Sequence, residues 1–209
     1  MKIVTAAALL ALPLLAQSPD WYRKHYFSVG GGAGLPGGDI KPLLDPSPAF
    51  RFNYGYRFHR YFQADAGIDT VFYAARVRDF YESDFGDLRI KDYQFFVPMG
   101  GRAIVPLMRN RVLLSAGGGG PYMRYQERVR QPFGDNFRID CPVCRARDGW
   151  GYYGLVGASV AIDRAQMIRL GFSTRVYRAD VAGQSIGAVP AIQTRDSWTN
   201  SAIEVTFSF

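Results

Sequence analysis

The chain has 209 residues and a formal net charge of +7, carried by 21 arginines and 4 lysines against 18 acidic residues. Aromatic residues make up 15% of it and glycine occurs 23 times, a composition that suits pleated sheets and argues against a helical bundle. An excess of basic residues is typical of nucleic-acid-binding proteins. Which acidic partner the charge favours therefore depends on the compartment in which the chain resides.

The N-terminus has the layout of a secretory signal peptide. Lys2 gives a positive start, residues 3–16 form an apolar run, and Ala16 precedes four mostly polar residues. The run is shorter than the roughly 20 residues of a membrane-spanning helix. We therefore expect residues 1–16 to be a signal peptide, residues 17–24 a short periplasmic segment and residues 25–209 the mature domain. An exported chain rarely meets nucleic acid, so the charge suits acidic lipid headgroups or a solvated surface instead.

From residue 25 onward the chain repeats one theme, in which apolar residues alternate with small or polar ones between turn signals. Eight such segments follow one another, at residues 25–34, 48–58, 61–73, 91–105, 112–124, 150–162, 167–178 and 200–209. In the second segment Phe50, Phe52 and Tyr54 share one face, while Arg51 and Asn53 share the other. Because side chains alternate along a strand, each segment predicts a strand with one apolar and one polar face.

The connections between these segments alternate in length. The short ones are residues 59–60, 106–111 and 163–166, and the long polar ones are residues 35–47, 74–90, 125–149 and 179–199. Short turns at one end and long loops at the other are typical of outer-membrane barrels. The predicted fold is therefore all-β: an eight-stranded antiparallel up-and-down transmembrane β-barrel with short periplasmic turns and long external loops.

In such a barrel the polar faces of the strands line the interior. The charged residues expected there are Arg51, Arg57, Asp65, Asp69, Arg102, Arg169, Arg175 and Glu204. Unpaired charges in so narrow a space are costly, so we expect these side chains to form ion pairs. Eight strands enclose a space that side chains can fill, which predicts a plugged lumen rather than an open pore.

Aromatic residues gather at both ends of the predicted strands. Those at the short-turn end are Tyr26, Phe27, Phe58, Tyr61, Phe62, Phe207 and Phe209, and those at the long-loop end are Phe50, Phe72, Tyr73, Tyr93, Tyr122, Trp150, Tyr152 and Tyr177. Two such groups are typical of the aromatic girdles that barrels place at the membrane interfaces. Aromatic residues are also common in soluble β proteins.

The last seven residues of the chain alternate apolar and polar and end in an aromatic. They resemble the C-terminal assembly signal of bacterial outer-membrane proteins, with Phe207 and Phe209 at apolar positions and Glu204 at a polar one; Thr206 stands where glycine is usual. Residues 25–209 together resemble the small outer-membrane barrel superfamily of the opacity-protein and OmpA-barrel type. The resemblance implies insertion by the barrel-assembly machinery into the outer membrane of a Gram-negative-type bacterium. It also implies surface-exposed loops, through which an external ligand can bind. The basic charge of the chain, by contrast, is what makes outer-membrane lipid or lipopolysaccharide the expected partner.

The sequence has two cysteines, Cys141 and Cys144, which flank Pro-Val in the longest loop. An oxidising compartment favours a disulfide between them, while a metal site, a redox dithiol and free thiols are alternatives. Residues 32–37 match the glycine pattern of dinucleotide-binding proteins, but the prolines that follow cannot continue the helix which that site needs. We therefore expect no cofactor.

The two histidines, His25 and His59, both belong to the short-turn end of the predicted barrel. A lipid-modifying enzyme would need its histidine near the outer leaflet, so we assign no catalytic or metal-binding residue and expect no enzyme. The predicted function is a structural or surface-interaction role in the outer membrane. Two alternatives stay open: an outer-membrane lipid-modifying enzyme, and a soluble lipocalin-like carrier. An apolar belt facing outward would argue against the carrier, and a His-Ser-acid cluster at the outer rim would favour the enzyme.

Overall fold

The computed structural model describes residues 22–76, 80–83, 86–129, 141, 143–184, 191 and 193–209. The expected signal peptide lies outside these residues. The strands are β1 (His25–Gly38), β2 (Ser47–His59), β3 (Phe62–Phe72), β4 (Phe80–Ser83), β5 (Gly86–Leu107), β6 (Val112–Val129), β7 (Ala146–Ala161), β8 (Ile168–Gly183) and β9 (Gln193–Ser208). In the described part of the chain, no helix is long and apolar enough to cross a membrane.

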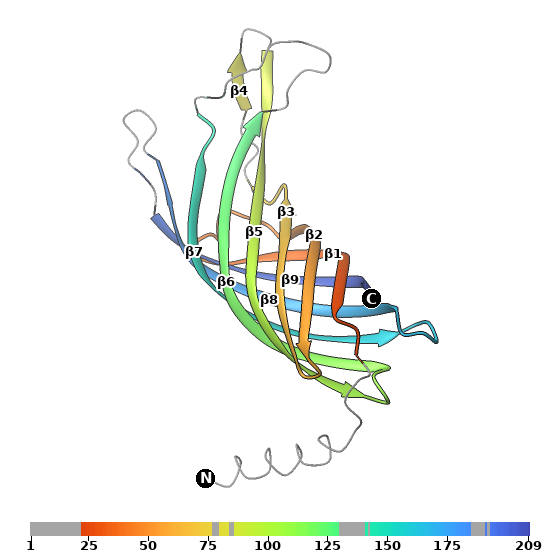
Figure 1. Cartoon of the computed structure of the whole chain (residues 1–209). Helices are drawn as coiled ribbons and strands as arrows, with labels where there is room; N and C mark the ends of the chain where they lie inside the picture. Colours follow the sequence, from red (N-terminus) through yellow and green to blue (C-terminus); the bar gives the residue numbers. More distant parts are fainter. Residues whose placement is uncertain are drawn as a thin grey trace, which may run out of the picture.

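Eight of these strands close into an antiparallel barrel (Figure 1). β1 pairs with β2 on one side and with β9 on the other, and β3 pairs directly with β5, which completes the ring. β4 is an additional short strand that pairs with the outer end of β5, where Phe80 lies opposite Arg89. The predicted eight-stranded barrel is confirmed.

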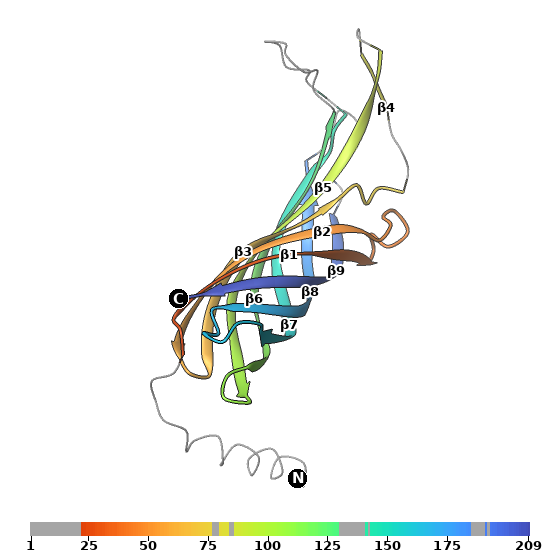
Figure 2. The same cartoon turned by 90° about the vertical axis from the view of Figure 1, so that its right-hand side faces the viewer.

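Most barrel strands run further on the long-loop side than the sequence predicts, namely β1, β5, β6, β7, β8 and β9. β5 begins at Gly86 and β6 ends at Val129, whereas the apolar alternation covers residues 91–105 and 112–124. The ladder continues through polar pairs such as Asp92 opposite Glu127, because backbone hydrogen bonds do not depend on the polarity of the side chains. In Figures 1 and 2 the outer ends of β5, β6 and β7, together with β4, stand beyond the rest of the barrel.

The period-two alternation sorts side chains between the two surfaces of the barrel as predicted. Arg51 and Asn53 on β2 are buried, while Phe52 between them is exposed. Phe172 on β8 and Ile203 on β9 are 55% and 62% exposed. The same outward surface carries further exposed apolar side chains from several strands, namely Val29, Phe62, Ile68, Met99, Val105, Leu114, Val156, Val160, Leu170, Val176 and Phe207. The barrel therefore has an apolar exterior and buries polar groups inside.

The long-loop half of the interior holds a large apolar cluster, which the sequence did not predict, together with buried polar side chains such as Asp92, Gln94 and Asp196. A buried cluster there contains Ile40, Leu44, Val71, Ala74, Phe96, Met123, Tyr153, Leu155, Tyr177, Ala179, Val181 and Trp198. The ring of Phe96 lies 4.5 Å from that of Tyr177 and 5.9 Å from that of Trp198, centroid to centroid. Ile40 and Leu44 come from the connection between β1 and β2 and pack into this cluster. The interior thus has a layer of paired charges and, nearer the long loops, an apolar cluster.

Two of the residues assigned to the aromatic girdles face the interior instead. Tyr26 is 8% exposed and Tyr177 is fully buried. Each lies two positions from another inward side chain, Ser28 and Arg175 respectively, so their position in the alternation outweighs their aromatic character. Outward aromatic residues such as Trp150 and Phe209 are more than half exposed.

Candidate functional site in the barrel lumen

A row of four residues across neighbouring strands brings opposite charges together in the lumen. Arg51 on β2 lies opposite Asp69 on β3, and Gly30 on β1 lies opposite both Arg51 and Glu204 on β9. A Cβ at Gly30 would stand 2.7 Å from Cγ of Glu204. Because glycine leaves this space open, Arg51 can reach across β1 to the glutamate.

Arg51 is the centre of this row and is 2% exposed. Its Nε donates to Oδ2 of Asp69 at 3.0 Å, and its Nη1 donates to Oε1 of Glu204 at 2.5 Å. Its Nη2 donates to the backbone carbonyl of Asn200 at 3.1 Å. Ser173 donates its hydroxyl to the same glutamate oxygen. The buried guanidinium therefore meets two carboxylates and a carbonyl.

Asp69 binds a second arginine from the opposite side of the lumen. Arg175 on β8 donates Nη1 to Oδ1 of Asp69 at 2.9 Å and Nη2 to Oδ1 of Asn53 at 2.8 Å. The hydroxyl of Tyr177 donates to Oδ2 of Asp69 at 2.7 Å. Asp69 and Arg175 are each 1% exposed. One carboxylate thus connects Arg51 on β2 with Arg175 on β8.

The third carboxylate, Asp65, forms a separate pair in the same polar layer. Arg102 on β5 donates Nε to Oδ2 of Asp65 at 2.6 Å and Nη2 to Oδ1 at 2.9 Å. Such a two-pronged contact is the geometry in which arginine and carboxylate bind most strongly. Gln63 donates to Oδ1 at 2.6 Å, and Asn53 donates to it at 3.3 Å.

The structure does not bring all eight predicted charges into one network. Arg51, Arg102 and Arg175 pair with Asp65, Asp69 and Glu204, so this group contains three positive and three negative charges. Arg57 and Arg169 lie nearer the short turns, and their partners there are neutral groups. The physical reason is their register: Arg57 lies opposite Gln63, and Arg169 lies opposite Ala161 and Thr206.

Four uncharged residues join the network in addition to the charged residues predicted from the sequence. Asn53, Gln63 and Ser173 occupy inward positions of β2, β3 and β8, alternating with outward apolar residues. Tyr177 follows Arg175 by two positions on the same face of β8. The period-two pattern therefore holds a signal that could have found all four.

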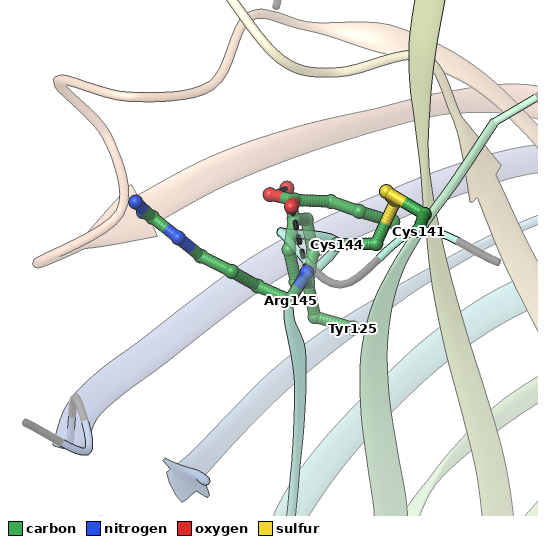
Figure 3. Close-up of a disulfide and its surroundings, with 5 residues drawn as sticks. Tyr125, Cys141, Cys144 and Arg145 are labelled. Atoms are coloured by element: carbon green, nitrogen blue, oxygen red, sulfur yellow. Dashed lines mark hydrogen bonds between the residues drawn. A yellow bond between two sulfur atoms is a disulfide. The ribbon is translucent and has the colours of Figure 1, made fainter. Parts of the chain in front are cut away.

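The predicted cysteine pair lies away from the lumen, beside the outer end of β6. Cys141 and Cys144 form a disulfide, with their Cα atoms 5.3 Å apart. Figure 3 shows this bond with Tyr125 and Arg145 nearby. Glu127 accepts a hydrogen bond from the Tyr125 hydroxyl at 2.8 Å and another from the backbone N–H of Arg145 at 2.8 Å. The disulfide thus closes a short loop directly before the entry into β7.

The two histidines lie at the short-turn end, as predicted. His25 begins β1, and its Nδ1 lies 2.8 Å from the hydroxyl of Tyr54. His59 ends β2, and its Nδ1 accepts the backbone N–H of Tyr61 at 3.4 Å. Among the described residues there is no group of three or more His, Cys, Asp or Glu side chains that could hold a metal ion.

The fold and its interior define a closed eight-stranded barrel, apolar outside and charged within. No family model and no curated protein sequence matches the chain. Among solved structures it is similar to Neisserial surface protein A, with 14% identity, a TM-score of 0.53, and coverage of 88% of this chain and 97% of that one. It is also similar to the outer membrane protein OprG from Pseudomonas aeruginosa, with 13% identity and a TM-score of 0.52; the match covers 90% of this chain and 98% of that one. A third similar structure is a major outer membrane protein from Thermus thermophilus, with 11% identity and a TM-score of 0.50; the match covers 88% of this chain and 99% of that one. The chain therefore has the fold of small outer-membrane β-barrels.

Proposed function

We propose that the chain is an outer-membrane β-barrel protein of a Gram-negative-type bacterium with a structural or surface-interaction role. The observation that carries this proposal is the outward apolar surface, on which Val156, Phe172 and Ile203 are each more than half exposed. So large a contiguous apolar surface is unfavourable in water and matches the hydrocarbon band of a membrane. Two of the similar structures are named as outer membrane proteins, which agrees with this location.

We propose further that the lumen is plugged and does not conduct. The polar layer holds the ion pairs of Arg51, Asp69 and Arg175, and the apolar cluster with Phe96 and Trp198 lies beyond it toward the long loops. A cavity of about 60 Å³ lies within the polar part of the lumen. It has room for a few water molecules at most, since each occupies roughly 30 Å³ in the liquid.

The surface role rests on the long-loop end of the barrel. β4 and the outer ends of β5, β6 and β7 project there (Figure 2), and arginines such as Arg124 and Arg128 are exposed. Exposed guanidinium groups can bind the phosphates of a lipopolysaccharide leaflet or an external ligand. Insertion by the barrel-assembly machinery, through Glu204, Phe207 and Phe209, is part of the same proposal.

The two alternatives meet less support. A lipocalin-like carrier would have an apolar interior along its whole length, whereas Arg51, Asp69 and Glu204 are buried in this one. A lipid-modifying enzyme would place a histidine near the outer leaflet, whereas His25 and His59 lie at the short-turn end. We therefore propose a non-catalytic role.

Fractionation of cells expressing the full chain tests the location and the topology together. We expect the protein in the outer-membrane fraction, with a gel mobility that changes on heating because the folded barrel resists detergent. External protease should cut the long loops of intact cells and spare the short turns. A chain that is soluble without detergent, or that is cut from the periplasmic side at the long loops, would contradict the proposal.

A further inference from the structure

A cavity of about 200 Å³ opens at the short-turn mouth of the barrel. It shares Tyr26 and Arg169 with the smaller polar cavity deeper in the lumen, which Arg102 and Glu204 also line. Three arginines line it, Arg23, Arg57 and Arg169, together with neutral hydrogen-bonding side chains of Tyr26, Gln166 and Ser208. None of the described residues that line it is aspartate or glutamate. The wall of this cavity is therefore strongly positive.

Two of these guanidinium groups are buried and meet only neutral partners in their hydrogen bonds. Arg57, 2% exposed, donates Nη1 to the Tyr26 hydroxyl at 3.1 Å and Nη2 to the carbonyl of Arg60. Its buried Nε has no hydrogen-bond partner among the described residues. Arg169, 3% exposed, donates Nη1 to the carbonyl of Asn110 at 3.1 Å. This differs from the deeper layer, where three arginines meet three carboxylates.

The acidic side chain of the adjoining turn is directed elsewhere. Asp163 accepts the backbone N–H groups of Met167 at 3.0 Å and Ile168 at 2.9 Å. Arg23 donates Nη2 to the carbonyl of Ala165 at 3.3 Å. Among the described residues Arg57 and Arg169 form no ion pair with a carboxylate, and a buried cation without such a partner is unfavourable. An anion that enters the cavity should therefore be stabilised there.

We propose that this cavity is a binding site for a phosphate group. The planar fork of arginine matches the oxygen atoms of phosphate, and the unpartnered Nε of Arg57 supplies a donor that no described protein group uses. The volume accommodates one phosphate with a few water molecules. The phosphate comes either as the free ion or as the headgroup of a phospholipid in the leaflet at the short-turn side.

Titration calorimetry of the folded full chain with inorganic phosphate, in a phosphate-free detergent at constant ionic strength, tests the proposal. We expect one phosphate per chain, and at least tenfold weaker binding in Arg57→Gln and in Arg169→Gln. The matched control is Arg178→Gln, which removes the same charge from an exposed position of β8 and should bind like the unmutated chain. Heat-dependent gel mobility checks that each variant is folded.

A second measurement needs no substitution. Because phosphate binds the folded state, it should raise the unfolding midpoint of the unmutated chain, while chloride at equal ionic strength should not. Absence of saturable binding and of this shift would overturn the proposal. Equal loss of binding in Arg178→Gln would also overturn it, because the effect would then be one of net charge.

Two further arms identify what occupies the site. If a phospholipid headgroup is the natural ligand, the chain purified from membranes carries bound lipid phosphorus that Arg169→Gln loses, and phosphate titration is silent in a bilayer. If free phosphate is the ligand, titration persists in the bilayer. Asp20, outside the described residues, is the nearest preceding acidic residue in the sequence. Phosphate binding that appears only in Asp20→Asn would overturn the proposal, since the cavity would then hold the chain's own carboxylate.

Discussion

Replacing Asp69 with asparagine should destabilise the barrel more than any change of an exposed charge. Its carboxylate accepts Arg51 Nε at 3.0 Å, Arg175 Nη1 at 2.9 Å and the Tyr177 hydroxyl at 2.7 Å, and it is 1% exposed. Asparagine keeps the shape, removes the charge and turns an N–H₂ group toward donors. Arg51 retains Glu204, but no other ion pair of Arg175 exists among the described residues. Removing one partner of a buried pair costs about 3–5 kcal/mol.

The matched control is Asp180→Asn. Asp180 pairs with Arg195 at 3.2 Å, and both side chains are about 80% exposed. Exposed ion pairs contribute less than about 1 kcal/mol, so the same substitution there should be nearly neutral.

Urea unfolding in lipid vesicles, followed by tryptophan fluorescence, measures the difference, because Trp198 is fully buried in the apolar cluster beside Phe96. With a urea slope of about 1–3 kcal/mol per molar, the midpoint of Asp69→Asn should fall by about 1 M or more. A loss of unfolding free energy no larger than that of Asp180→Asn would refute the reasoning. It would mean that water, rather than Asp69, compensates the buried guanidinium groups.

Three further predictions concern the membrane band, the closing strand and a turn. Phe172→Arg should cost about 2–4 kcal/mol by placing a charge in the apolar band, lowering the folded fraction on heat-modifiable gels, whereas unchanged folding would place Phe172 outside the band. Deleting residues 205–209 should abolish membrane insertion, because the beginning of β1 then loses its pairing partners on β9 and the barrel cannot close. Deleting residues 141–144 should leave insertion intact. The same gels measure both deletions, and a folded form of the chain without residues 205–209 would contradict this reasoning. The pKa of Asp163 is held below its usual value of 3.8, chiefly by the backbone N–H of Ile168. The Asp163 carboxylate therefore stabilises the fold above that pH, and this contribution is lost as the pH falls through the lowered pKa. The difference in unfolding free energy between the unmutated chain and Asp163→Asn should shrink over this acidic range. A difference that stays constant there would contradict the prediction.

The sequence predicted the strands and the two surfaces of the barrel because both follow from local alternation. A neighbouring pair such as Arg51 and Phe52 fixes the orientation of its strand, since arginine does not suit the lipid-facing surface and phenylalanine does not suit the polar lumen. The outward assignment of Tyr177 failed for a related reason: an aromatic residue is compatible with a membrane interface and with a packed interior. The sequence does place it two positions after Arg175, and that spacing is the stronger signal.

Other features could not be derived from the sequence because they depend on contacts across the barrel. The apolar cluster joins Phe96, Met123 and Trp198 from three strands with Ile40 from a connection, and only the closed fold brings them together. The partners of Arg57 were unpredictable in the same way, since register decides which inward residue lies opposite. The extension of β5 and β6 was missed because polar residues carry a ladder as well as apolar ones do.

The distribution of the ion pairs along the chain has a consequence for the rate at which the barrel opens. Arg51 and Asp69 belong to the neighbouring strands β2 and β3, and Arg175 and Glu204 to the neighbouring strands β8 and β9. The bonds from Arg51 to Glu204 and from Arg175 to Asp69 join these two hairpins across 153 and 106 residues. When the two hairpins move apart, both of these bonds must break together rather than one after the other. We therefore expect these two cross-bonds to slow the opening of the barrel, because contacts that break before the transition state of unfolding raise its activation barrier.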